Sequence, residues 1–164
     1  MKLDHIAYRV RSRDATVWFF KSLDYEIEEE FQIDFDDGSK AECMVMAPTS
    51  LQLETHEEAK LFISQGTPGS IVDEWVRERG KAGGVHHMAY EVEDVEQTMA
   101  EMSAQGIEFL SDEPLSCEGL IQVFTKPSPL TSIIYEFISY TNAERRAFCR
   151  DNIKDLMEST NDLK

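Results

Sequence analysis

Two copies of one short pattern decide the fold of this chain. Residues 3–10 read LDHIAYRV, and residues 85–92 read VHHMAYEV. The copies are separated by 82 residues, because the histidines they share are His5 and His87 and 87 − 5 = 82. At this offset the alanine, the tyrosine and the final valine of the pattern are also identical. Such internal self-similarity indicates that one structural unit is used twice.

Each copy has the signature of a strand, an amphipathic helix and three further strands. In the first helix Val17, Phe20 and Leu23 recur with helical spacing. Apolar or alternating runs bounded by turn residues predict the later strands at 25–34, 41–46 and 51–54, and in the second copy at 107–110, 119–125 and 132–138. Two more helices are predicted at 70–79 and 142–157.

This order of elements is an α+β architecture with two tandem βαβββ modules and a C-terminal helix. The chain has 164 residues, of which 41% are hydrophobic, and this size fits a single structural domain. Within it we assign residues 1–56 to the first module, 57–84 to a connector with a helix, 85–140 to the second module and 141–164 to a helical tail.

Charge and segment composition exclude several classes of function. The net charge is 16 − 32 = −16, which repels nucleic-acid phosphates and anionic lipids, so we expect neither nucleic-acid nor membrane binding. No apolar run is long enough to span a bilayer and the first residues lack a signal-peptide core, so we expect a cytoplasmic protein. The three cysteines are widely spaced and lack a CxxC pair, so we expect neither a disulfide framework nor a thiolate zinc site.

The repeat also points to a metal site. His5 and His87 occupy equivalent positions, and neutral imidazole is the commonest metal ligand in proteins. Glu136 is a lone carboxylate in an apolar strand, where burial is costly unless a cation compensates it. Gln52 and Glu54 project from one face of their predicted strand, and either could complete the set. We therefore predict one divalent ion, which could be Co, Ni, Mn, Zn or Fe(II).

With these residues the chain resembles the vicinal oxygen chelate superfamily, which includes glyoxalase I, methylmalonyl-CoA epimerase and the 2-oxo-acid dioxygenases. The resemblance implies a cupped, eight-stranded mixed sheet around one metal, with ligands from the first and last strands of each module. Those positions are His5, Gln52, His87 and Glu136 in this sequence. It further implies a small-molecule substrate, a homodimer and no organic cofactor.

One set of motifs is similar to methylmalonyl-CoA epimerase: LDHIAY at 3–8, AECMVMAP at 41–48 and GVHHMAY at 84–90. This resemblance implies an acyl-CoA thioester substrate and an acid/base role for Glu42. Four protein ligands would leave an octahedral ion two open positions, enough for a substrate chelate but not for dioxygen as well. Our first hypothesis is therefore an epimerase or isomerase that abstracts a proton α to a metal-polarised carbonyl.

A second set of motifs resembles 4-hydroxyphenylpyruvate dioxygenase, namely LIQVFTKP at 120–127 and the tail at 147–159. This resemblance implies Fe(II), a 2-oxo acid substrate and a substrate contact from Gln122, with Lys126 of the same motif as a further binding candidate. It also implies that the C-terminal helix gates the cavity, and it requires that Gln52 is not a ligand. A lyase of the glyoxalase type and a non-catalytic binding or resistance module on the same fold are the remaining alternatives.

Overall fold

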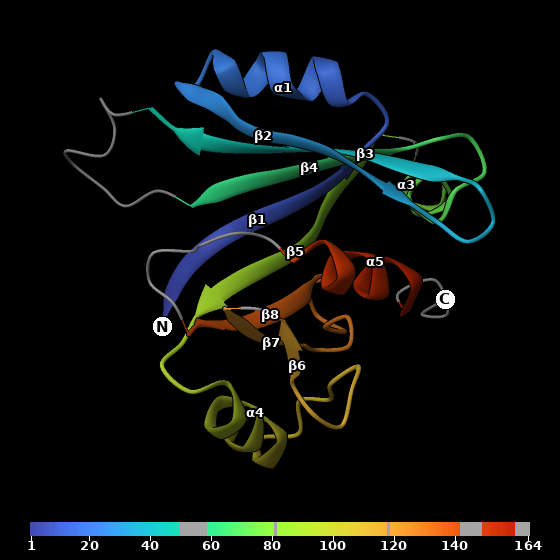
Figure 1. The fold of residues 1–164 in the computed structure, drawn as a ribbon. Coiled ribbons are helices and arrows are strands. Elements are labelled where there is room, and N and C mark those ends of the chain that lie inside the picture. The colour runs from blue at the N-terminus through green and yellow to red at the C-terminus, as the bar shows by residue number, and fades with distance from the viewer. Residues whose placement is uncertain (50–58, 81, 118, 142–148, 160–164) are drawn as a thin grey trace. The chain divides into compact units, whose positions relative to one another are not determined.

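The fold of the protein was obtained as a computed structural model, which describes residues 1–49, 59–80, 82–117, 119–141 and 149–159 (Figure 1). Within these ranges the elements are β1 Lys2–Val10, α1 Arg13–Lys21, β2 Tyr25–Asp34, β3 Lys40–Pro48, β4 Lys60–Gly66, α3 Ile71–Glu78, β5 Gly83–Glu91, α4 Val95–Ala104, β6 Leu115–Cys117, β7 Leu120–Phe124, β8 Ile134–Tyr140 and α5 Arg150–Ser159. The predicted α+β class and the repeated βαβββ order are confirmed.

The strands form the predicted eight-stranded mixed sheet, and their order in it is β2-β3-β4-β1-β5-β8-β7-β6. In each module the first and last strands are parallel, β1 with β4 and β5 with β8, and the remaining neighbours within a module are antiparallel. The chain divides into two compact units, one formed by His5–His86 and the other by Met1–Asp4 with His87–Lys164.

In the unit His5–His86, α1 covers one face of the strands (Figure 1). The helix begins after Ser12, whose side chain accepts a hydrogen bond from the Ala15 backbone N–H at 3.3 Å. Its buried residue Val17 packs into a core with apolar side chains from three strands, which are Val10, Met44, Met46, Leu61 and Ile63. Val10 lies five positions after His5 on the same strand, so their side chains project from opposite faces. The apolar core under α1 is therefore on the face turned away from His5.

The fourth strand of this unit differs from the prediction. The predicted strand at 51–54 lies outside the described residues, and β4 occupies Lys60–Gly66, inside the range assigned to the connector. The residues Leu61, Phe62 and Ile63 are all buried, because β4 is flanked by β1 and β3 and is covered on both faces. A run of three apolar residues has no apolar/polar alternation, so the sequence pattern does not indicate a strand there.

In the second unit, α4 begins after Asp94, whose carboxylate accepts a hydrogen bond from the Gln97 backbone N–H at 2.9 Å. The helix packs on β7 and β8 around Val92, Val95, Val123 and Phe137. The strands predicted at 119–125 and 132–138 are confirmed as β7 and β8 within two residues at each end. The segment predicted as a strand at 107–110 makes only a single bridge, between Phe109 and Thr125, and β6 follows at Leu115–Cys117.

The C-terminal helix α5 is joined to the sheet covalently and by packing. Leu156 contacts a cluster that contains Phe124 of β7 and Ile134 of β8. Cys149, directly before α5, forms a disulfide with Cys117 at the end of β6, with 6.4 Å between their Cα atoms. The expectation of no disulfide was therefore wrong, because the two cysteines are 32 positions apart in the sequence and only the fold brings them together.

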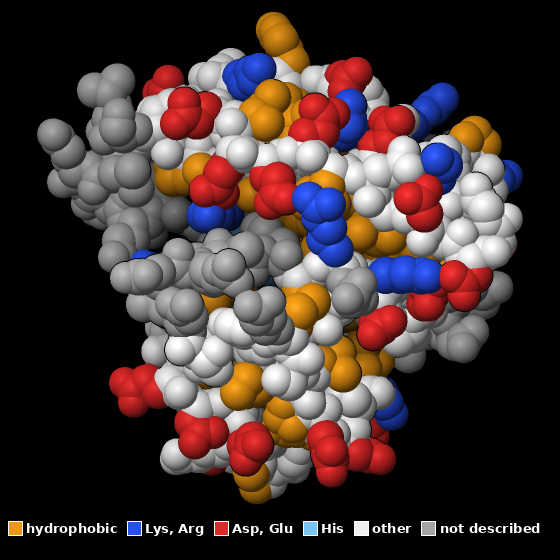
Figure 2. Space-filling model, in the orientation of Figure 1, with side chains coloured by type: hydrophobic (Ala, Val, Ile, Leu, Met, Phe, Trp, Pro, Cys, Tyr) orange, Lys and Arg blue, Asp and Glu red, His pale blue; other side chains and the backbone are white. Residues whose placement is uncertain are grey.

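The surface carries the acidic charge expected from the composition. On the face drawn in Figure 2, acidic side chains gather over α4, where Glu96 and Glu101 are exposed. None of the helices in the described ranges has the length and apolarity needed to cross a membrane.

Candidate metal centre

His87 and Glu136 are brought together by the parallel pairing of β5 with β8. Glu136 pairs with Ala89, which lies two residues beyond His87, so both functional side chains are on one face of the strands. His87 Nε2 lies 3.5 Å from Glu136 Oε2, and the two residues are only 7% and 2% exposed. The ring of Phe124 contacts His87 edge-on, with 5.9 Å between ring centroids.

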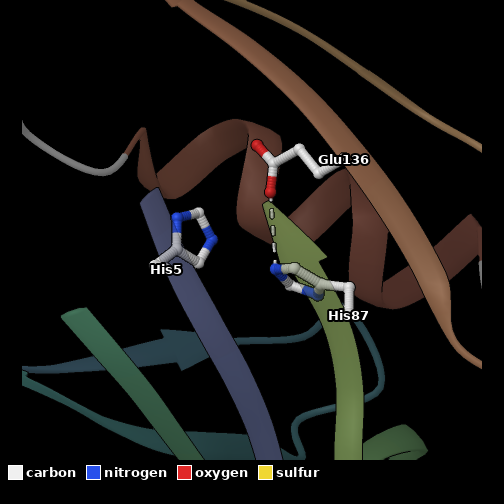
Figure 3. A group of neighbouring side chains, drawn as sticks. All are labelled: His5, His87 and Glu136. Atoms are coloured by element: carbon white, nitrogen blue, oxygen red, sulfur yellow. Dashed lines mark ion pairs between the residues drawn. The ribbon is translucent and has the colours of Figure 1, made fainter. Parts of the chain in front are cut away.

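His5 is the third member of the group. It is 2% exposed and lies on β1, at the repeat position equivalent to His87. His5, His87 and Glu136 each offer one ligand atom, and these atoms all lie within 4.8 Å of one another. Figure 3 shows the three side chains pointing toward one another from β1, β5 and β8.

This donor set fits a divalent cation. An ionised carboxylate buried as deeply as Glu136 is costly unless a positive charge compensates it. Two ligands at about 2.1 Å from one ion, at right angles, lie about 3 Å apart, which is close to the 3.5 Å between His87 Nε2 and Glu136 Oε2. Two imidazoles with one carboxylate form the facial set that binds Fe(II) in many oxygenases.

The strand register identifies the residue of the first module that corresponds to Glu136. In the second module Glu136 pairs with Ala89, and in the first module the equivalent Ala7 pairs with Phe62. Phe62 is therefore the register equivalent of Glu136 in the first module, and its side chain has no donor atom. The predicted ligand Gln52 lies outside the described residues, as does Glu54, so their roles stay predictions.

Glu42 lies on the opposite face of its sheet from His5. His5 and Arg9 share one face of β1, and Arg9 pairs with Ser64, which in turn pairs with Cys43. Since Cys43 shares the face of His5, the adjacent Glu42 projects from the other one. The structure does not bring Glu42 to the metal centre.

The surroundings of Glu42 agree with this position. Its carboxylate is 3.8 Å from Arg13 Nη1, and Arg13 belongs to α1, which covers the face away from His5. The Glu42 side chain is 51% exposed, so solvent screens the pair.

The two predicted substrate contacts have different positions. Gln122 is buried on the face that carries Glu136, because it lies two residues from Phe124, the partner of Glu136 in the antiparallel β7·β8 pair. Lys126 instead extends along the surface, where its Nζ is 2.7 Å from Glu108 Oε2. The hydrogen bond from Lys126, together with its charge, lowers the pKa of Glu108.

Sequence reasoning missed several residues on the face of His5. Phe31 and Phe62 form an aromatic pair there, with ring centroids 5.9 Å apart. Arg9 is buried on the same face with its guanidinium 5.7 Å from the Trp75 ring centroid, and burial, followed by the charge of Arg79, lowers the pKa of Arg9 to about 9. The available signal was the alternation along β1, which placed His5, Ala7 and Arg9 on one side.

The buried His/His/Glu group could hold a divalent metal ion, but a fold by itself does not define an activity. The sequence pattern that defines the Glyoxalase/Bleomycin resistance protein/Dioxygenase superfamily matches residues 4–123, and the chain belongs to this superfamily. Its members are mostly metal-dependent enzymes. None of the curated proteins matches the chain.

Solved structures share the fold at low sequence identity. A methylmalonyl-CoA epimerase is 21% identical with a TM-score of 0.65, over 87% of this chain and 97% of the epimerase. A mutant of 4-hydroxymandelate synthase from Streptomyces coelicolor is 21% identical with a TM-score of 0.78, over 98% of this chain and 53% of the synthase. A Streptomyces coelicolor epimerase in complex with 2-nitronate-propionyl-CoA is 22% identical with a TM-score of 0.58, over 87% of this chain and 99% of that one. This chain thus spans about half of the synthase and nearly all of the epimerases.

Proposed function

We propose that this protein is an Fe(II)-dependent oxygenase of a 2-oxo acid. The observation that carries the proposal is Phe62, which stands where a fourth ligand would come from the last strand of the first module. His5, His87 and Glu136 then form the complete protein ligand set. This favours the second of the two sequence-based hypotheses over the epimerase, which needs both a fourth ligand and a base in the position of Glu42.

The ion would be held by His5, His87 and Glu136. A ferrous ion in this facial donor set supplies open coordination positions for a bidentate 2-oxo acid and for dioxygen, together with the redox chemistry. In the overall reaction the 2-oxo acid loses its carboxyl group as CO2. One oxygen atom of O2 is added to the former 2-oxo carbon, which becomes the new carboxylate. The other oxygen atom is added to another carbon of the same molecule, which is thereby hydroxylated.

The residues of the chain bind and orient the substrate around this set. Burial of the three ligands keeps bulk water away from the reacting atoms. Gln122 offers a buried side-chain amide on the face of Glu136, suited to hydrogen-bond a substrate oxygen. The rings of Phe31 and Phe62 provide apolar surface on the face of His5, suited to an aromatic or aliphatic substituent. The likeness to 4-hydroxymandelate synthase, whose name denotes an aromatic product, supports an aromatic substrate.

Oxygen consumption by the iron-loaded protein tests this proposal. Protein loaded with Fe(II) without oxygen is mixed with phenylpyruvate or 4-hydroxyphenylpyruvate and then exposed to O2. We expect O2 uptake and CO2 release in a one-to-one ratio. Glu136→Gln should lower iron affinity by more than the roughly 10- to 100-fold typical of supporting residues, and O2 uptake should fall with it.

Glu42→Gln is the matched control, since it is the same substitution on the opposite face. Its iron content and its rate should stay within about twofold of the unsubstituted protein. The epimerase is the competing outcome. If Co(II)-loaded protein exchanges the α-proton of methylmalonyl-CoA in D2O, and Glu42→Gln or Gln52→Ala abolishes that exchange, the oxygenase proposal is wrong.

A further inference from the structure

The first turn of α5 contains a buried amide nitrogen that has no hydrogen-bond partner among the described residues. Asn152 is 7% exposed, and its Nδ2 has no hydrogen-bond partner among the described residues. A buried donor without a partner is destabilising, and native proteins keep few of them. Such a group calls for an explanation in terms of something that the folded chain alone does not contain.

The packing of α5 shows which way Asn152 faces. Leu156 lies one helical turn further on, and residues four apart share a side of a helix. Leu156 packs with Phe124 of β7 and Ile134 of β8. Asn152 therefore lies on the side of α5 that is turned to these strands, as its burial also indicates.

The strand face beneath α5 is the face of the metal centre. Phe124 pairs with Glu136 in the antiparallel β7·β8 ladder, and Ile134 pairs with His87 in the parallel β5·β8 ladder. Paired residues on neighbouring strands project to the same side. The helix side that carries Asn152 thus covers the strand face that carries two of the three proposed ligands.

We propose that Asn152 is a substrate-binding residue, whose Nδ2 donates a hydrogen bond to an oxygen atom of the bound 2-oxo acid. This inference rests on the proposed function. An amide Nδ2 is only a donor, so its ligand must present an acceptor oxygen, and a 2-oxo acid with or without a ring hydroxyl presents several. Gln122 on the same face supplies a second amide, so the substrate would be held from the sheet and from α5 together.

Anaerobic binding separates this role from catalysis. The probes are phenylpyruvate and 4-hydroxyphenylpyruvate, titrated by calorimetry into Fe(II)-loaded protein without oxygen. Asn152→Leu removes the donor and keeps the approximate side-chain volume. We expect its Kd for the bound probe to rise about tenfold, the change given by loss of one hydrogen bond. Its iron content should be unchanged and its melting temperature equal or higher, because an unsatisfied buried group has been removed.

Asn152→Ser provides a second variant in case the leucine disturbs packing, and it should weaken binding in the same direction. A loss of affinity for both probes assigns the hydrogen bond to the 2-oxo acid end. A loss of affinity confined to the hydroxylated probe assigns it to the ring hydroxyl. Unchanged Kd in both variants would overturn the role of Asn152 while leaving the oxygenase intact. If the unsubstituted protein binds neither probe, the proposed function fails and this inference fails with it.

Discussion

At the scale of single residues, the predicted substrate contact Lys126 instead forms a surface ion pair with Glu108. The pKa of Glu108 is lowered by the hydrogen bond and the charge of Lys126. The pair therefore stabilises the fold above the ordinary carboxyl pKa, and this contribution is lost as the pH falls through the lowered value. Lys126→Met should raise the pKa of Glu108 toward its ordinary value, which a side-chain NMR titration measures. Substrate affinity should stay within about twofold, and a much larger loss would restore Lys126 as a binding residue.

The residues of the metal centre differ in how far the sequence could predict them. His5 and His87 could be predicted because the repeat places them at equivalent positions. Glu136 could be predicted because a single carboxylate stands out in an apolar strand. The position of Phe62 could not be predicted, because its correspondence to Glu136 depends on the register of β4 against β1. Glu42 was assigned by resemblance, and only the register of β3 with β4 shows that it faces away from His5.

At the scale of elements, β4 is a central strand, so truncating one of its buried side chains should lower the free energy of unfolding substantially. Ile63 is fully buried, between α1 on one side and strands on both flanks. Ile63→Ala should lower the free energy of unfolding by about 2–5 kcal/mol, because it leaves a cavity in addition to losing buried apolar surface. Chemical denaturation measures this change.

Leu130→Ala is the control for β4, since Leu130 is 93% exposed and its truncation should alter stability by less than about 0.5 kcal/mol. A loss below about 1 kcal/mol for Ile63→Ala would contradict the central position of β4.

Elements with local start signals were predicted better than elements without them. The helix predicted at 70–79 is α3, Ile71–Glu78, because Ser70 caps it by accepting a hydrogen bond from the Asp73 backbone N–H at 3.2 Å. The fourth strand of the first module has no such signal. Its three buried apolar residues follow a lysine and precede a polar stretch. A strand with both faces covered lacks the apolar/polar alternation that marks a half-buried strand in a sequence.

At the scale of the whole molecule, the covalent tie between β6 and α5 connects stability to redox conditions. Disulfides persist mainly in oxidising compartments, so the state of this pair in the cell bears on the cytoplasmic location predicted from the sequence. The link also fixes the start of α5, the helix that we infer to carry a substrate contact. Reduction should therefore affect both global stability and the order of this helix.

The disulfide between Cys117 and Cys149 should contribute measurably to the unfolding equilibrium. It closes a loop between residues 32 positions apart, and the chain-entropy relation gives about 3–4 kcal/mol for a loop of this size. Urea denaturation should show this loss on adding a phosphine reductant, and Cys117→Ser with Cys149→Ser should reproduce it without reductant. A thiol assay on denatured protein, purified without reductant, should find one free thiol, that of Cys43, and three after reduction. Three thiols before reduction would show that the pair does not form, and α5 would then be held by non-covalent packing, including that of the buried Leu156 and Met157.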